Sequence, residues 1–233
     1  MSVDLGRVEK LRTPAEAAGL IRPGWTLMVG GFGLSGCPLA VLEALAERDD
    51  LRDLTVISNN LGEPGLGLGT LLLQGKIRKA IGSFFTSNPD VGAAYLAGRL
   101  EIELIPQGSM SEAIRAGGAG IPAFYTPTAA GTKLAEGREQ REIDGRLCLL
   151  QPALRADAAL VRAAVADELG NLVYRASMRN FNPMMASAAD LVIAEVDEIV
   201  PTGAISPDHV VTPHLYVDLL VLRPWPEGAD GDR

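Results

Sequence analysis

Amide side chains and glycines stand directly after several apolar runs of the sequence. In open parallel sheets, ligands bind beyond the carboxyl ends of the strands. The segments at these positions are Gly30–Gly36, Ser58–Asn60, Gly82–Ser83 and Pro106–Ser109. They carry no carboxylate or histidine, and a single thiol, that of Cys37, follows the first segment. We therefore expect Asn59, Asn60 and Gln107 to hydrogen-bond a bound group, although simple turns also use these residue types.

The glycine-rich segment has the spacing of a dinucleotide-binding fingerprint, G-x-G-x-x-G, at Gly31, Gly33 and Gly36. That fingerprint needs an acidic residue about 20 positions later to bind a ribose hydroxyl. The segment Val56–Asn59 stands there and contains no acid. We expect no nicotinamide cofactor, and we interpret the segment, with Phe32, as a tight turn that directs backbone N–H groups at an anion or carbonyl.

The thiols and imidazoles offer little further chemistry. Cys37 and Cys148 cannot form a disulfide framework, which favours a reducing compartment. Cys37 precedes Pro38 at a predicted helix start, where a thiol pKa can fall, but a packed small residue is the preferred interpretation. His209 and His214 lie in a proline-broken segment and are expected at the surface or in packing, so we predict no metal site.

Apolar runs that alternate with helical patterns predict an α/β fold. We expect an open, mostly parallel sheet with helices on both faces and a smaller strand-rich part. A hairpin is predicted at Asp144-Gly145, and a helix is predicted from Ser109, whose spacing to Glu112 is that of a capping box. The predicted strands are Thr26–Val29, Leu54–Ile57, Ile77–Ile81, Ile102–Ile105, Arg141–Ile143, Arg146–Leu150, Ala158–Val165, Leu172–Tyr174, Leu191–Val196 and Val217–Leu222, and the other predicted helices are Pro38–Arg48, one that Asn88 caps, and one that includes Ala186–Ala189.

Composition limits the class of protein. With 233 residues and no linker-like stretch, we expect a single domain over 1–233, with a polar tail from about residue 224 to 233. The net charge of −8 argues against a nucleic-acid partner. We find neither a secretory signal nor an apolar stretch of about 18 residues, so we expect no membrane span and a cytoplasmic protein.

Several short segments, in order and spacing, resemble the A subunit of the class I coenzyme A-transferases of the 3-oxoacid type. The similarity runs from about Leu11 to Leu222, and one departure is Pro23, where that family usually has an acid. The segments are Gly30-Gly31-Phe32, Gly36-x-Pro38, Ser58-Asn59-Asn60, Pro106-Gln107-Gly108, Gly117–Thr128, Gly170–Val173, Arg179–Pro183 and Thr212-Pro213.

The resemblance implies an enzyme that transfers coenzyme A from succinyl-CoA to a 3-oxoacid such as acetoacetate, as in ketone body metabolism. In that family a glutamate in a Ser-Glu-Asn-Gly motif of the B subunit is the nucleophile, and this sequence contains no Glu-Asn-Gly. The chain is therefore expected to act only with a B subunit, and to need no cofactor beyond the thioester substrate. The resemblance implies that Gln107 positions an oxyanion or carboxylate, and that Asn59, Asn60, Gly31, Phe32, Gly33 and Gly36 bind substrate.

Two alternatives stay open. Arg141–Arg146 is similar to the 3-oxoadipate version of the family, whereas Gly67–Gly69 and Gly120–Phe124 are closer to the acetoacetate version. The other alternative is a non-catalytic domain of the same fold that binds an acyl group or a sugar phosphate. A neighbouring reading frame with Ser-Glu-Asn-Gly would favour the transferase.

Overall fold

The main sheet of the computed structural model, which describes Asp4 and residues 8–224, has nine strands. Every pair of strands in it is parallel except β9 with β10, so the predicted open, mostly parallel sheet is confirmed. The strand order is β1-β12-β11-β9-β2-β3-β4-β5, with β10 beside β9. These strands are β1 (Leu11–Arg12), β2 (Thr26–Val29), β3 (Leu54–Ile57), β4 (Ile77–Gly82), β5 (Glu101–Leu104), β9 (Ala156–Asp167), β10 (Leu172–Val173), β11 (Ala189–Val200) and β12 (Leu219–Leu222).

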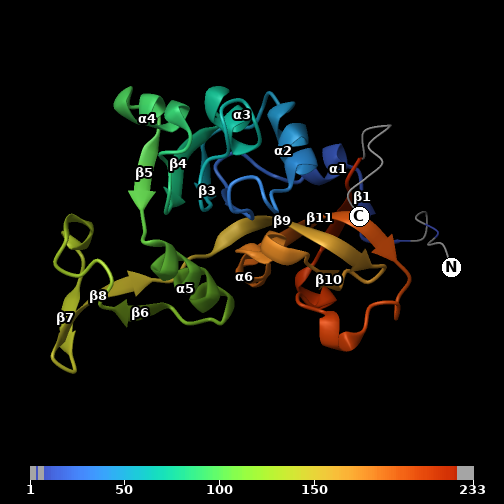
Figure 1. Cartoon of the computed structure of the whole chain (residues 1–233). Helices are drawn as coiled ribbons and strands as arrows, with labels where there is room; N and C mark the ends of the chain where they lie inside the picture. The colour runs from blue at the N-terminus through green and yellow to red at the C-terminus, as the bar shows by residue number, and fades with distance from the viewer. Residues whose placement is uncertain (1–3, 5–7, 225–233) are drawn as a thin grey trace.

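Helices cover both faces of this sheet, as predicted. Helices α1–α4 lie along one face, and α5 and α6 pack on the other (Figure 1). Because successive residues of a strand point to opposite faces, Leu27 of β2 packs in one core and Met28 in the other. The helices are α1 (Pro14–Ala18), α2 (Leu39–Ala46), α3 (Leu68–Leu73), α4 (Pro89–Leu96), α5 (Gln107–Gly118) and α6 (Asn182–Ser187), with short 3₁₀ helices η2 (Lys133–Ala135), η3 (Ala176–Arg179), η4 (Pro207–His209) and η5 (His214–Tyr216).

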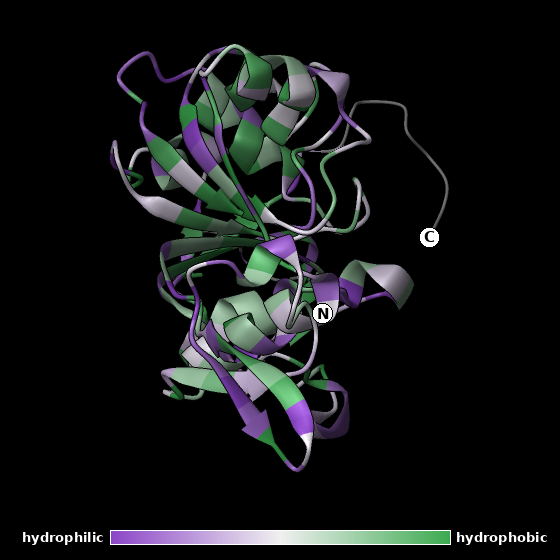
Figure 2. Cartoon of the chain, turned by 90° about the vertical axis from the view of Figure 1, so that its left-hand side faces the viewer, coloured by the Kyte–Doolittle hydropathy of each residue, from purple (hydrophilic) through white to green (hydrophobic). Residues whose placement is uncertain are grey.

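A smaller antiparallel sheet lies beyond α5, on the side away from α1–α4 (Figures 1 and 2). Its order is β6-β8-β7, and its strands are β6 (Ala123–Thr126), β7 (Gln140–Ile143) and β8 (Arg146–Pro152). The turn between β7 and β8 is Asp144-Gly145, with φ of 51° and 71°. Positive φ at both central residues is the geometry of a type I′ turn, so the predicted hairpin is confirmed.

Helix α5 begins earlier than the sequence predicts. The capping-box prediction at Ser109 is wrong, because the helix starts at Gln107, directly after Pro106. The carbonyl of Pro106 accepts the N–H of Met110 at 2.8 Å, which closes the first turn. Ser109 is buried within that turn. Gln107 therefore stands at the first position of a helix, next to the end of β5.

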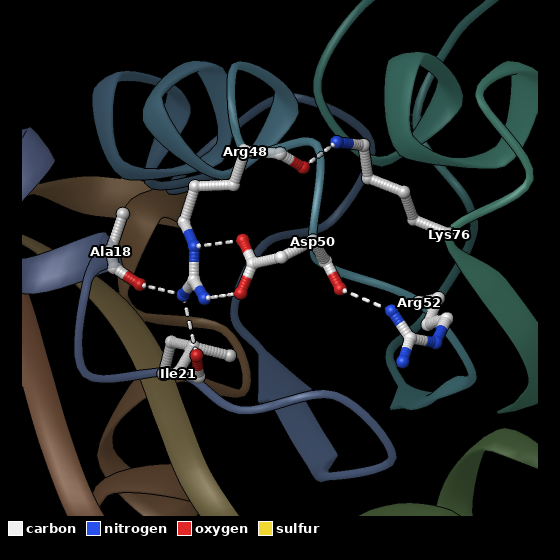
Figure 3. Close-up of polar contacts among 6 residues, drawn as sticks. All are labelled: Ala18, Ile21, Arg48, Asp50, Arg52 and Lys76. Carbon is white, nitrogen blue, oxygen red and sulfur yellow. Dashed lines mark hydrogen bonds and ion pairs between the residues drawn. The ribbon is translucent and has the colours of Figure 1, made fainter.

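Arg48, two residues beyond the end of α2, contacts the end of α1 (Figure 3). Its guanidinium donates to the carbonyls of Ala18 at 2.7 Å and Ile21, and it pairs with Asp50 at 2.6 Å. The buried Lys76 donates in turn to the carbonyl of Arg48. Carbonyls at a helix end lack partners within the helix. Arg48 supplies a donor to the last residue of α1 and so joins α1 to the segment after α2.

Some predictions have no test in the structure. The polar tail lies outside the described residues from residue 225 onward. Within residues 8–224, no helix is long and apolar enough to cross a membrane. The single-domain organisation and the cytoplasmic location stay predictions.

Candidate functional site

The structure brings Asn59 and Gln107 together at the carboxyl edge of the main sheet. Asn59 follows β3, is 2% exposed, and donates from Nδ2 to Ser83 Oγ at 3.0 Å and to Gln107 Oε1 at 3.2 Å. Ser83 follows β4, so three adjacent strand ends supply the three side chains. Gln107 itself is exposed, and its amide N–H groups donate to no other described residue. This arrangement holds Gln107 by its oxygen and leaves its N–H groups available to a carbonyl or carboxylate.

Asn60 also lies at this edge but has a local partner. Its Oδ1 accepts the N–H of Gly62 at 3.1 Å, and its carbonyl accepts the hydroxyl of Ser58. The side chain is 8% exposed. The structure thus gives Asn60 a role in the turn after β3, and a contact between Asn60 and substrate stays a prediction.

The glycine segment after β2 forms a tight turn, as predicted. Phe32 and Ser35 exchange backbone hydrogen bonds at 3.0 and 3.3 Å, and the Phe32 side chain is 51% exposed. We call Gly30–Cys37 the glycine loop. Glycine is required at two of its positions because a Cβ at Gly30 would lie 1.7 Å from Asn182 Oδ1, and one at Gly36 2.6 Å from the carbonyl of Met178.

Two asparagines hold the glycine loop from the segment at the start of α6. Asn182 is fully buried, donates to the carbonyl of Gly36 at 3.0 Å, and accepts the N–H of Arg162 at 3.0 Å. Asn180 accepts the N–H of Gly31 at 3.1 Å and donates to the carbonyl of Ser35 at 3.0 Å. The buried amide of Asn182 needs such partners, and the half-buried Asn180 adds two further bonds to the loop. The two asparagines and the loop therefore hold one another in place. The rule that ligands bind beyond the carboxyl ends of the strands did not point to either asparagine.

Glu195 holds the start of α2, just after the glycine loop. It is fully buried on β11, and its Oε2 accepts the N–H groups of Ala40 at 2.8 Å and Val41 at 3.2 Å. The other carboxylate oxygen of Glu195, Oε1, is buried without a hydrogen-bond partner. The same holds for Nε of Arg162, the residue of β9 that lies opposite Glu195 in the sheet. Burial raises the pKa of Glu195 to about 6, against the opposing effects of the Val41 N–H, the Arg162 charge and the Ala40 N–H.

The thiol and the imidazoles have the positions that the sequence suggests. Cys37 is 4% exposed, and burial, followed by the charge of Glu195, raises the pKa of its thiol to about 12. Because the thiolate is the reactive form, Cys37 is a packed residue at neutral pH. His209 and His214 are exposed, and no metal-ligating cluster of His, Cys, Asp and Glu occurs among the described residues.

Comparisons with known proteins identify the family of this chain. Residues 11–223 match the family model described as Coenzyme A transferase. The chain is 54% identical to the A subunit of a succinyl-CoA:3-ketoacid coenzyme A transferase of Xanthomonas campestris pv. campestris (strain B100), over 91% of this chain and 88% of that one. It is 46% identical to the A subunit of a 3-oxoadipate CoA-transferase of Pseudomonas putida, over 89% of this chain and 90% of that one.

A solved structure shares the fold. This is an acyl-CoA transferase from Escherichia coli O157:H7 in a thioester complex with CoA, with a TM-score of 0.83 and 21% identity. The match covers 92% of this chain but 49% of the E. coli chain, so this chain spans about half the length of that protein.

The buried Glu195 predicts a pH dependence of stability that its glutamine variant lacks. The folded carboxyl has a pKa of about 6 against its ordinary value of 4.5, so the folded state binds this proton more tightly than the unfolded state. The stabilisation is fully present below about pH 4.5 and is lost as the pH rises through about 6. The wild type should lose about 2 kcal/mol of its free energy of unfolding across this window. Glu195→Gln keeps an acceptor for α2 and should not show this loss.

Urea unfolding at pH values from 4.5 to 7 measures this effect. Glu198→Gln, at an exposed position of the same strand, is the matched control and should follow the wild type. Parallel stability curves for the wild type and Glu195→Gln would show that the carboxyl does not titrate in this window.

Proposed function

This chain belongs to the coenzyme A transferase family, and we propose that it is the A subunit of an enzyme that transfers coenzyme A from succinyl-CoA to a 3-oxoacid. The observation that carries the proposal is the 54% identity, over nearly the full length of both chains, to an A subunit named for that activity. The site supports it, because amides and glycines at the strand ends suit an acyl group and a carboxylate.

We further propose that the reaction follows the family's covalent route. A glutamate carboxylate of the partner attacks the thioester carbonyl of succinyl-CoA, and the C–S bond breaks to give a mixed anhydride and the CoA thiolate. The thiolate then attacks the glutamyl carbonyl, which releases succinate and leaves a glutamyl-CoA thioester. The same steps in reverse, with acetoacetate, give acetoacetyl-CoA and the free glutamate. Covalent catalysis of this kind divides one difficult transfer into easier ones.

Gln107 supplies neutral donors in this scheme, and Asn59, whose two N–H groups bond Ser83 and Gln107, holds Gln107 in place. The Gln107 oxygen is held by Asn59, so its N–H groups are directed away from that bond toward the open edge of the sheet. Donors held in place before the reaction stabilise the negative charge that develops on an acyl oxygen. We propose no metal and no cofactor beyond the thioester substrate.

A B subunit is the partner that this site needs. The segments that follow β2, β3, β4 and β5 at the site, Gly30–Gly36, Ser58–Asn60, Gly82–Ser83 and Pro106–Ser109, contain no acid that could act as the nucleophile. The relatives named above are subunits of larger enzymes. Phe32 and Phe84, beside the site after β2 and β4, are 51% and 52% exposed. Exposed apolar side chains around an incomplete site indicate a surface that another protein covers. We propose that the partner's glutamate enters here.

The acceptor acid has a second candidate. The 46% identity to the A subunit of a 3-oxoadipate CoA-transferase favours 3-oxoadipate as an alternative to acetoacetate. Parallel assays of the assembled enzyme with succinyl-CoA and each acid, and with acetate, identify the acceptor by the highest kcat/KM.

Gln107→Ala should lower turnover of the assembled enzyme by roughly 10²-fold, as for the loss of one oxyanion donor. Because Gln107 is exposed, the melting temperature should change little. Steady-state kinetics and thermal unfolding measure the two effects. Gln74→Ala, an exposed glutamine after α3, is the control. Full turnover in Gln107→Ala would show that Gln107 takes no part in the reaction.

The purified chain alone should have no transferase activity, because it lacks the nucleophile. Addition of a B subunit should restore turnover of succinyl-CoA with acetoacetate. Borohydride added with acyl-CoA should then modify a glutamate of the partner, as mass spectrometry of the digested proteins would show. Turnover by the chain alone, or a label on its Glu63, Glu112 or Glu195, would contradict the two-subunit proposal.

A further inference from the structure

Two arginines stand on the segment that packs against the glycine loop. Arg175 precedes η3 and Arg179 ends it, and both side chains are exposed. No acidic side chain of the described residues forms an ion pair with either of them. By contrast, Arg162 of β9 pairs with Asp197 at 2.9 Å. The two guanidinium groups are therefore available to an anion from outside the chain.

The contacts of η3 place these arginines beside the site. Ser177, between them, lies with its Oγ 3.0 Å from Oγ of Ser35 in the glycine loop. Asn180, directly after Arg179, donates to the carbonyls of Ser35 at 3.0 Å and Ser177 at 2.8 Å. The backbone that carries both arginines is thus fixed to the outer turn of the loop.

The backbone of η3 has an uncommon conformation. Ala176 has φ of +45°, in the left-handed region that residues with a Cβ rarely adopt. Such conformations persist where the surroundings hold them, and they occur often at ligand sites. Here the bonds from Ser177 and Asn180 to the glycine loop hold it.

Two cavities elsewhere in the described residues are poorer candidates for an anion. One, of about 330 Å³ between α2 and α3, is lined by the carboxylates of Glu43 and Glu47. The other, of about 200 Å³ between β5 and β8, contains Arg138, which already pairs with Glu103 at 3.3 Å.

We propose that Arg175 and Arg179 bind phosphate groups of the coenzyme A portion of the acyl-CoA substrate, an inference that rests on the proposed function. Coenzyme A carries a pyrophosphate and a 3′-phosphate, and the planar guanidinium fork matches phosphate oxygens. The chain has a net charge of −8, which would repel this ligand. A local pair of cations beside the loop offsets that repulsion where the thioester arrives.

Kinetics of the assembled enzyme with two thioesters test the proposal. Arg175→Ala/Arg179→Ala should raise KM for succinyl-CoA by about tenfold or more, since charged hydrogen bonds to phosphate are lost. The kcat and the KM for acetoacetate should change little. With succinyl-pantetheine, which has the same thioester and no phosphates, variant and wild type should be equal. Arg175→Lys/Arg179→Lys keeps both positive charges and should bring the KM for succinyl-CoA part of the way back. Arg99→Ala removes an exposed arginine after α4 and is the control for loss of a positive charge.

Three results would overturn the proposal. An equal loss with both thioesters would show that the arginines support the fold of the loop. An unchanged KM with weaker binding of the B subunit would assign them to the interface between the two chains. An unchanged KM with normal assembly would leave them no role in binding substrate. If the wild-type complex has no transferase activity, the proposed function fails instead, and calorimetry of coenzyme A binding to the same variants then decides this proposal.

Discussion

The amide groups of Asn180 and Asn182 hold the glycine loop against the main sheet, and the rest of the site depends on that contact. Asn182 is fully buried, so its N–H groups need acceptors and its oxygen needs a donor. The carbonyl of Gly36 and the N–H of Arg162 meet these needs, and they come from the loop and from β9. Gly30 and Gly36 leave the space that the asparagines fill. The loop, α6 and the central strand are therefore fixed relative to one another before any ligand binds.

A second buried group extends this arrangement to α2. The carboxylate of Glu195 accepts two N–H groups at the first turn of the helix that follows the loop. A negative charge is favourable at a helix N-terminus, but burial without a second partner for Oε1 is costly. Across the sheet, Gln107, held by Asn59, presents neutral donors instead of an acid. The proposed division of chemistry follows from this: one chain binds and orients the acyl group, and its partner supplies the carboxylate that reacts.

The sequence was informative where local chemistry decides the structure. Alternating apolar runs predict the strands, and Asp144-Gly145 predicts a turn that needs positive φ. The rule for strand ends brings Asn59 and Gln107 to one edge because the sheet is parallel there. The capping-box pattern fails at Ser109, because the helix begins two residues earlier, after Pro106. Asn182 could not be predicted in the same way, since its partner Gly36 lies 146 positions away in the sequence. The position of Arg175 and Arg179 beside the loop likewise depends on contacts between distant residues, those of Ser177 and Asn180 with Ser35.

Hydrogen exchange in the glycine loop, measured by mass spectrometry in wild type and Asn182→Ala, tests the central claim most directly. Asn171→Ala, which removes a hydrogen-bonded asparagine away from the loop, is the control. If the asparagine amides hold the loop, peptides spanning Gly31–Cys37 should exchange at least about tenfold faster in Asn182→Ala, because the Gly36 carbonyl loses its donor. Peptides from β4 should be unchanged. Equal protection of the loop in all three proteins would contradict the account.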